Sequence, residues 1–228
     1  SVAELEGGEL PIHADIIPTL QNFQSVMRTS GEKISILENN EIKILHHPWQ
    51  IFQYNDWAIR HDFALVTEGK ISQPISATNR CINEQQIFIE EGAEVEHCII
   101  NAATGPVYIG KSAIVMEGSM IRGPFSIGEQ SVVKMGTKIY GAVSVGPGCT
   151  IGGEIKNAVF FEYSNKAHDG YLGDSVIGAW CNLGAGTSNS NVKNTGGEVK
   201  FMLGKYHSSI SAGNKAGLLM GDYSRAGI

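Results

Sequence analysis

The chain has 228 residues, enough for one large domain or two small ones. Its 17 Lys and Arg residues stand against 23 Asp and Glu residues, and the resulting charge of −6 gives no electrostatic reason to expect nucleic acid or an anionic membrane as a partner. No apolar run approaches the roughly 18 residues of a membrane-spanning helix, and residues 1–6 lack the basic and apolar regions of a signal peptide.

Residues 1–80 are expected to form a small α+β segment. A helix is predicted over Pro18–Ser30, where the apolar residues fall on one face and Gly31 suits the C-terminal cap. Strands over Ile34–Leu37 and Ile42–Leu45 flank four polar residues and predict a hairpin.

A second helix is predicted to begin near Pro48 and to run to about Val66. Its buried stripe is expected to contain Phe52, Ile59 and Phe63. Trp49 and Trp57 are interpreted as packing residues rather than ligand platforms. The polar stretch Gly69–Arg80 is interpreted as a linker into the next domain.

From Ile87 onward the sequence repeats with a period of six. Eight consecutive aliphatic residues keep this spacing, namely Ile109, Val115, Ile121, Ile127, Val133, Ile139, Val145 and Ile151. Small residues lie four positions after most of them: Ala113, Ser119, Ser131, Thr137 and Cys149. A period of six fits neither a helix nor a simple strand, but it is typical of hexapeptide-repeat β-helices. We therefore predict a mainly β fold whose stacked coils bury the aliphatic column.

The repeat is interrupted after Ile155 and returns near Leu172. It is looser from Lys200 to Ile228, where the glycines indicate further coils. The four cysteines, Cys81, Cys98, Cys149 and Cys181, are widely spaced, so we expect free thiols in a reducing cytoplasm. A solenoid without a terminal cap is unusual, so we expect the natural protein to continue beyond one or both ends.

The interruption carries a recognisable motif. Lys166–Asp174 reads KAHDGYLGD, and Asn182–Thr187 reads NLGAGT. This pattern resembles the acetyltransferase domain of the bifunctional UDP-N-acetylglucosamine pyrophosphorylase / glucosamine-1-phosphate N-acetyltransferase family. That family has a histidine, a tyrosine three positions later, Leu-Gly-Asp, and then Asn-Ile-Gly-Ala-Gly-Thr. The resemblance covers about residues 105–192.

The resemblance implies a left-handed parallel β-helix in residues 81–228, with residues 1–80 as the tail of a nucleotidyltransferase domain plus linker. It implies a cytoplasmic homotrimer that uses acetyl-CoA as cosubstrate and needs no metal for acetyl transfer. The acceptor would be an amino-sugar 1-phosphate, glucosamine 1-phosphate first, in UDP-N-acetylglucosamine synthesis. The intact protein would also be a nucleotidyltransferase, but residues 1–80 contain no Gly-x-Gly-Thr-Arg nucleotide loop and are too few for that fold.

Matched by position, His168 corresponds to the family's catalytic base, and Glu154 to a glutamate near it. Residues that match the sugar-phosphate site are Lys138, Lys156, Tyr171, Asn182 and Asn191. Ala185 matches an alanine whose backbone contacts the acetyl-CoA arm.

The reaction itself favours these residue types. An amine that attacks a thioester must lose a proton, which a histidine can accept near neutral pH. The oxyanion needs donors, which the backbone of Gly184–Gly186 can supply. The phosphate needs cations, for which Lys138, Lys156 and Lys166 are candidates.

Two departures put the exact sugar in question. The family has one more residue between the lysine and His168, and its Tyr-Asp-Gly and lysine after Asn191 are replaced, so that Lys193 or Lys200 would take that lysine's role. One alternative is therefore an acyltransferase for another amino sugar or nucleotide sugar.

Two further alternatives belong to other classes. A second alternative is a non-catalytic structural β-helix. A zinc carbonic anhydrase of the same fold needs three histidines around the metal. Here His97, His168 and His207 are far apart in sequence, and the close pair His46-His47 precedes the coils.

Overall fold

The computed structural model describes residues 2–3, 12–13, 16–17, 43–203 and 208–227. The predicted helix over residues 18–30 and the first predicted hairpin strand over residues 34–37 lie outside these ranges. The second predicted strand forms as β4 (Lys43–Ile44), whose antiparallel partner is β3 (Ile16–Ile17). A further short pair joins β1 (Val2–Ala3) to β2 (Ile12–His13).

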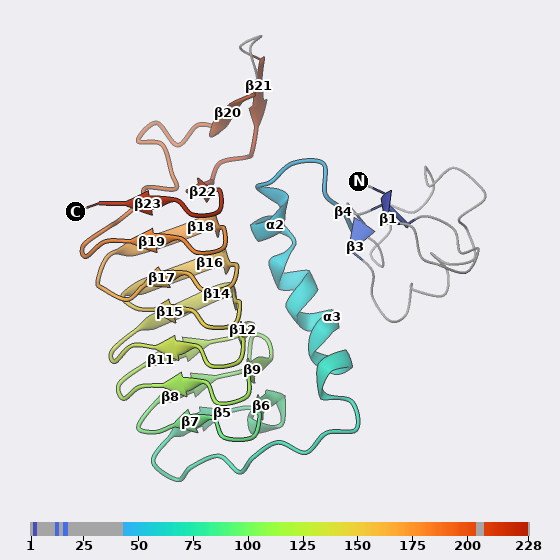
Figure 1. Ribbon diagram of the computed structural model, residues 1–228, viewed down its shortest axis with the longest axis vertical. Coiled ribbons are helices and arrows are strands. Elements are labelled where there is room, and N and C mark those ends of the chain that lie inside the picture. The colour runs from blue at the N-terminus through green and yellow to red at the C-terminus, as the bar shows by residue number, and fades with distance from the viewer. Residues whose placement is uncertain (1, 4–11, 14–15, 18–42, 204–207, 228) are drawn as a thin grey trace.

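The predicted second helix forms in two pieces, α2 (Gln50–Gln53) and α3 (Asn55–Thr67). The two pieces lie along one side of the β structure (Figure 1). Of the predicted stripe, Phe52 and Ile59 are buried and Phe63 is half-buried. None of the helices in the described residues is long and apolar enough to cross a lipid bilayer.

A buried asparagine joins α3 to the β structure. The Nδ2 atom of Asn55 donates to the carbonyl of Ala142 at 2.9 Å, and its Oδ1 atom accepts from the Ser144 hydroxyl at 2.7 Å. Asn55 is only 5% exposed. Because buried polar groups cost free energy when they lose their partners, this pair of bonds fixes the helix in place.

We expect Asn55→Ala to lower the free energy of unfolding by about 1–3 kcal/mol, because the Ala142 carbonyl and the Ser144 hydroxyl lose their partner. Urea unfolding measures the change. Asp56→Ala is the matched control, since Asp56 is exposed and pairs with Arg60 at the surface, a contact worth less than about 1 kcal/mol. Equal losses in the two variants would contradict the assigned role of Asn55.

The rest of the chain forms a β-solenoid of about six turns. Its seven-stranded sheet contains β7 (Glu94–Val95), β10 (Ile114–Val115), β13 (Val132–Val133), β15 (Thr150–Ile151), β17 (Asn165–Lys166), β19 (Asn182–Leu183) and β23 (Arg225–Ala226). Its ten-stranded sheet contains β5 (Arg80–Ile82), β6 (Ile87–Ile89), β8 (Ile99–Asn101), β9 (Val107–Ile109), β11 (Met120–Arg122), β12 (Phe125–Ile127), β14 (Lys138–Val145), β16 (Glu154–Phe160), β18 (Tyr171–Ile177) and β22 (Leu219–Met220). A 3₁₀ helix spans Glu84–Gln86.

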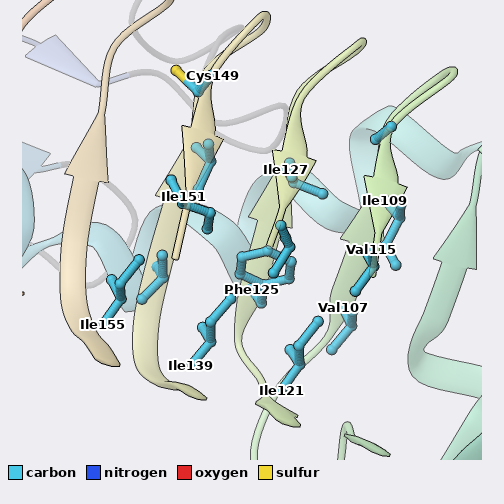
Figure 2. Close-up of a cluster of buried hydrophobic side chains, with 14 of the residues drawn as sticks. Val107, Ile109, Val115, Ile121, Phe125, Ile127, Ile139, Cys149, Ile151 and Ile155 are labelled. Carbon is cyan, nitrogen blue, oxygen red and sulfur yellow. The ribbon is translucent and has the colours of Figure 1, made fainter. Parts of the chain in front are cut away.

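Neighbouring coils pair in parallel, and equivalent residues face each other, as Val115, Val133 and Ile151 do. The prediction of a left-handed parallel β-helix preceded by a small α+β segment is confirmed. The eight predicted aliphatic residues are each at most 4% exposed. Figure 2 shows part of this column, with Phe125 among the aliphatic side chains.

The small residues of the repeat are buried, and the hydroxyl groups among them are hydrogen-bonded. The Ser131 hydroxyl donates to the carbonyl of Gly146 at 2.8 Å and accepts from the N–H of Cys149 at 2.9 Å. Ser164 repeats this arrangement with Gly178 and Cys181 in a later coil. A small side chain therefore fits the corner and also links one coil to the next.

The stretch interpreted as a linker hydrogen-bonds to the first coil. The N–H of Gln73 donates to the carbonyl of Ile89 at 2.8 Å. The Asn79 side chain donates to Val95 and accepts from Cys98, each at 2.8 Å. This stretch therefore covers the free edge of the first coil, as terminal caps do in repeat proteins.

The looser C-terminal stretch differs from the prediction of further coils. The chain leaves the solenoid after β19 and forms an antiparallel hairpin of β20 (Lys200–Leu203) and β21 (Ser208–Ser211). The hairpin projects beyond the last coils (Figure 1). Its Phe201 ring stacks on the ring of Trp49, the residue before α2, with centroids 4.9 Å apart. Coils resume only at β22. The prediction relied on the glycines of this stretch, which permit a coil but do not by themselves specify one.

Candidate active site

Parallel pairing brings three predicted site residues into one row. Lys138, Glu154 and Tyr171 are direct partners on β14, β16 and β18. The residues that follow them, Ile139, Ile155 and Leu172, are buried in the core. Since side chains alternate along a strand, the row points outward.

A second outward row lies two positions further along the same strands and contains Tyr140, Lys156 and Gly173. The Tyr140 hydroxyl donates to the Glu154 carboxylate at 2.5 Å, and this bond together with burial raises the pKa of Tyr140 to about 12. The Glu154 carboxylate makes no hydrogen bond to the His168 imidazole, although the structure describes both residues. Tyr140 was not singled out from the sequence, and only the strand register places it in the site.

Asp174 joins three segments of the site. It is 5% exposed and accepts from the Asn157 side chain at 2.7 Å and from the Asn191 side chain. The Asn191 amide also donates to the Tyr171 hydroxyl at 3.0 Å. The structure thus brings Asn191 to Tyr171 from a position twenty residues away in sequence. Burial, followed by the charge of Asp174, raises the pKa of Tyr171.

His168 lies on the loop 167–170, which joins β17 to β18 and ends directly before Tyr171. The His168 side chain is exposed. The imidazole makes no hydrogen bond within the described residues. The loop packs closely on its neighbours, because a Cβ atom on Gly170, which has φ of +128°, would lie 2.1 Å from the Thr187 carbonyl. A side chain at that position would therefore displace the loop.

No protein-family model matches the chain. The bifunctional sugar-1-phosphate nucleotidylyltransferase/acetyltransferase of Sulfurisphaera tokodaii is 31% identical in an alignment of 254 residues. The alignment covers 98% of this chain and 56% of that protein. The bifunctional protein GlmU of Methanococcus maripaludis is 37% identical over 157 residues in strain S2 and 28% identical over 193 residues in strain C5. These alignments cover 68% and 80% of this chain, and 36% and 38% of the relatives.

The chain is similar in sequence to these bifunctional proteins. It spans between about a third and a little over half of the length of these curated relatives. The family resemblance in residues 105–192 is therefore supported by relatives that align with most of the chain.

The turn after β19 was expected to supply oxyanion donors. Two of its N–H groups are already bonded within the fold, that of Gly184 to Ala226 at 2.9 Å and that of Gly186 to Asp169 at 3.1 Å. The N–H of Ala185, in an exposed residue, makes no hydrogen bond within the described residues. The structure thus narrows the predicted donor to Ala185, the residue matched to the acetyl-CoA contact.

Asn182 lies on the other sheet. Its Oδ1 atom accepts from the Asn165 side chain of the preceding coil at 2.7 Å, in a ladder on the seven-stranded sheet. The structure places no hydrogen bond between Asn182 and Tyr171 or Asn191, all of which are described.

The prediction for Lys166 is wrong. It was considered as a phosphate-binding cation, but it is 1% exposed and occupies the inward position equivalent to Ile151. The spacing from Ile151 to Lys166 is shorter than the regular repeat, so the sequence did not show that Lys166 points inward. Burial lowers its pKa to about 8, while the nearby Asp169 acts in the opposite direction.

Proposed function

We propose that this chain catalyses acetyl transfer from acetyl-CoA to the amine of an amino-sugar 1-phosphate, glucosamine 1-phosphate first, in UDP-N-acetylglucosamine synthesis. The observation that carries the proposal is the meeting of Tyr171, Asn191 and Lys156 on one outer face directly beside the loop of His168. The sugar-1-phosphate class agrees with the name of the Sulfurisphaera tokodaii relative.

In the proposed reaction, the neutral amine of the substrate attacks the thioester carbonyl. The His168 imidazole accepts the proton that the amine nitrogen loses as the C–N bond forms. The Ala185 N–H donates to the oxyanion that forms. When the intermediate collapses, the C–S bond breaks and the departing CoA thiolate takes up the proton held by His168. The products are the N-acetyl sugar phosphate and CoA.

Substrate binding is assigned by side-chain chemistry. Lys138 and Lys156 would hold the phosphate, while Tyr171, Asn182 and Asn191 would hold the amino sugar. Glu154 would act on His168 only through bound substrate or another group, because its direct partner is Tyr140. Within the described residues, no three His, Cys, Asp or Glu side chains gather as a metal site.

We also propose a homotrimer and, for the whole protein, a nucleotidyltransferase activity. An open groove of about 490 Å³ runs beside the outward rows. It is lined by the half-exposed apolar side chains of Ile99 and Met120 together with Arg122 and Lys138. An apolar, cationic groove of this kind fits closure by a neighbouring subunit that completes an anionic substrate site.

The decisive experiment measures CoA release with glucosamine 1-phosphate and, in parallel, galactosamine 1-phosphate, using the full-length protein and this chain. Turnover with glucosamine 1-phosphate supports the proposal. Turnover only with galactosamine 1-phosphate favours the alternative acceptor. Absence of both turnover and acetyl-CoA binding would favour a structural β-helix.

Lys156 provides a test of the phosphate site. We expect Lys156→Met to raise KM for the sugar phosphate by about 10–100-fold with little change in kcat, because a charge-assisted contact of about 1.5–3 kcal/mol is lost in ground state and transition state alike. Steady-state kinetics measures both constants. Lys111→Met, at an exposed corner of an earlier coil, is the control and should leave KM unchanged. An unchanged KM in Lys156→Met would remove Lys156 from the site.

A further inference from the structure

Lys166 is a charged residue in an otherwise aliphatic column. Its strand partner in the preceding coil is Ile151, and Leu183 follows one coil later. All three side chains are almost completely buried. An aliphatic residue would fill the space without the cost of burying a charge, so packing alone does not explain a lysine here.

The coil is longer at this corner than the one before it. Ile151 pairs with Lys166 and Glu154 pairs with Tyr171, so residues 152–153 of one coil correspond to residues 167–170 of the next. The added length is the loop that carries His168. A longer corner projects from the regular ladder and needs other hydrogen bonds to hold its backbone.

The Lys166 side chain supplies those bonds. Its Nζ atom donates to the carbonyls of His168 at 3.0 Å and of Gly170 at 2.9 Å, and to that of Gly152 in the preceding coil at 3.0 Å. An ammonium has three N–H donors, so three carbonyl acceptors satisfy it completely. The group therefore ties the backbone of His168 and of Gly170 to the coil beneath.

We propose that Lys166 is a positioning residue, whose buried ammonium fixes the backbone of the loop 167–170 and thereby sets the place of the His168 imidazole beside Tyr171. This inference rests on the proposed function for its catalytic consequence. With a pKa of about 8, the side chain stays protonated at neutral pH, so all three donors are retained.

The test compares Lys166→Met with Ile151→Met, which places the same side chain at the equivalent position of the preceding coil. Hydrogen exchange of the peptide spanning residues 165–175 reports the loop, and kinetics separates kcat from KM. We expect Lys166→Met to fold, to exchange the loop amides at least about 10-fold faster, and to lose about 100-fold in kcat with little change in KM, since misplacing a catalytic group by about 1 Å can cost that much.

Loop exchange and kcat equal to those of Ile151→Met would overturn the proposal. If the parent protein is inactive with every sugar phosphate, the exchange rates still decide whether Lys166 anchors the loop, so failure of the proposed function is recognised separately. If Lys166→Met does not fold, Lys166→Gln replaces it. Its amide has only two N–H donors for the three carbonyls, so we still expect faster loop exchange and a lower kcat than in Ile151→Met.

Discussion

Replacing His168 by alanine should abolish acetyl transfer while leaving the solenoid intact. The side chain is exposed and makes no hydrogen bond within the described residues, so its removal should change the free energy of unfolding by less than about 0.5 kcal/mol. Loss of a general base typically costs about 100–10,000-fold in rate. We therefore expect kcat to fall by that factor while acetyl-CoA still binds.

CoA release and thermal unfolding measure the two effects together. The control is Asp169→Asn, which changes the neighbouring exposed side chain and should leave turnover within a few-fold of the parent. A His168→Ala variant with the parental rate would remove His168 from the mechanism. A variant that loses its fold would show that the loop has a structural role that its exposure does not indicate.

Asp174→Asn should weaken both the fold and sugar binding. The parent carboxylate accepts from two amide groups, those of Asn157 and Asn191. Asparagine has nearly the same shape and tolerates the φ of +48° at this position, but it replaces one acceptor oxygen with an N–H donor. One buried amide then faces a donor, which we expect to cost about 1–3 kcal/mol of stability.

The kinetic consequence follows from the bond between Asn191 and Tyr171, which Asp174 holds in place. We expect a rise in KM for the sugar phosphate as the two side chains separate, measured by steady-state kinetics beside urea unfolding. Asp169→Asn is again the control, because it makes the same substitution in an exposed residue. If stability falls but KM does not, Asp174 serves the fold and not the sugar site.

The sequence predicted the core of the solenoid residue by residue, because an inward position recurs every six residues and each coil repeats the last. Val115, Val133 and Ile151 illustrate this regularity. Prediction failed where the register changes. Lys166 follows Ile151 by fewer residues than a full repeat, so it was considered as a phosphate-binding cation although it points inward.

The hydrogen-bond partners within the candidate site could not be predicted from the sequence either. The bonds from Tyr140 to Glu154 and from Asn157 to Asp174 cross between neighbouring coils, and only the exact strand pairing defines them. The motif identified Tyr171 and Asn191, and the structure brings them together. The motif gave no role to Asp174, because a buried hydrogen-bond acceptor can be recognised only once its partner residues are known.

The segment of residues 49–79 has a consequence for how the molecule comes apart. A plain solenoid is nearly one-dimensional: each coil touches only its neighbours, and an end can fray without disturbing the middle. Here the segment stacks Trp49 on the hairpin beyond the last coils, bonds Asn55 to the middle of the stack, and covers the first coil through Gln73. The two ends of the stack therefore share a common element, so that loosening at one end is transmitted to the other and the coils between them melt together.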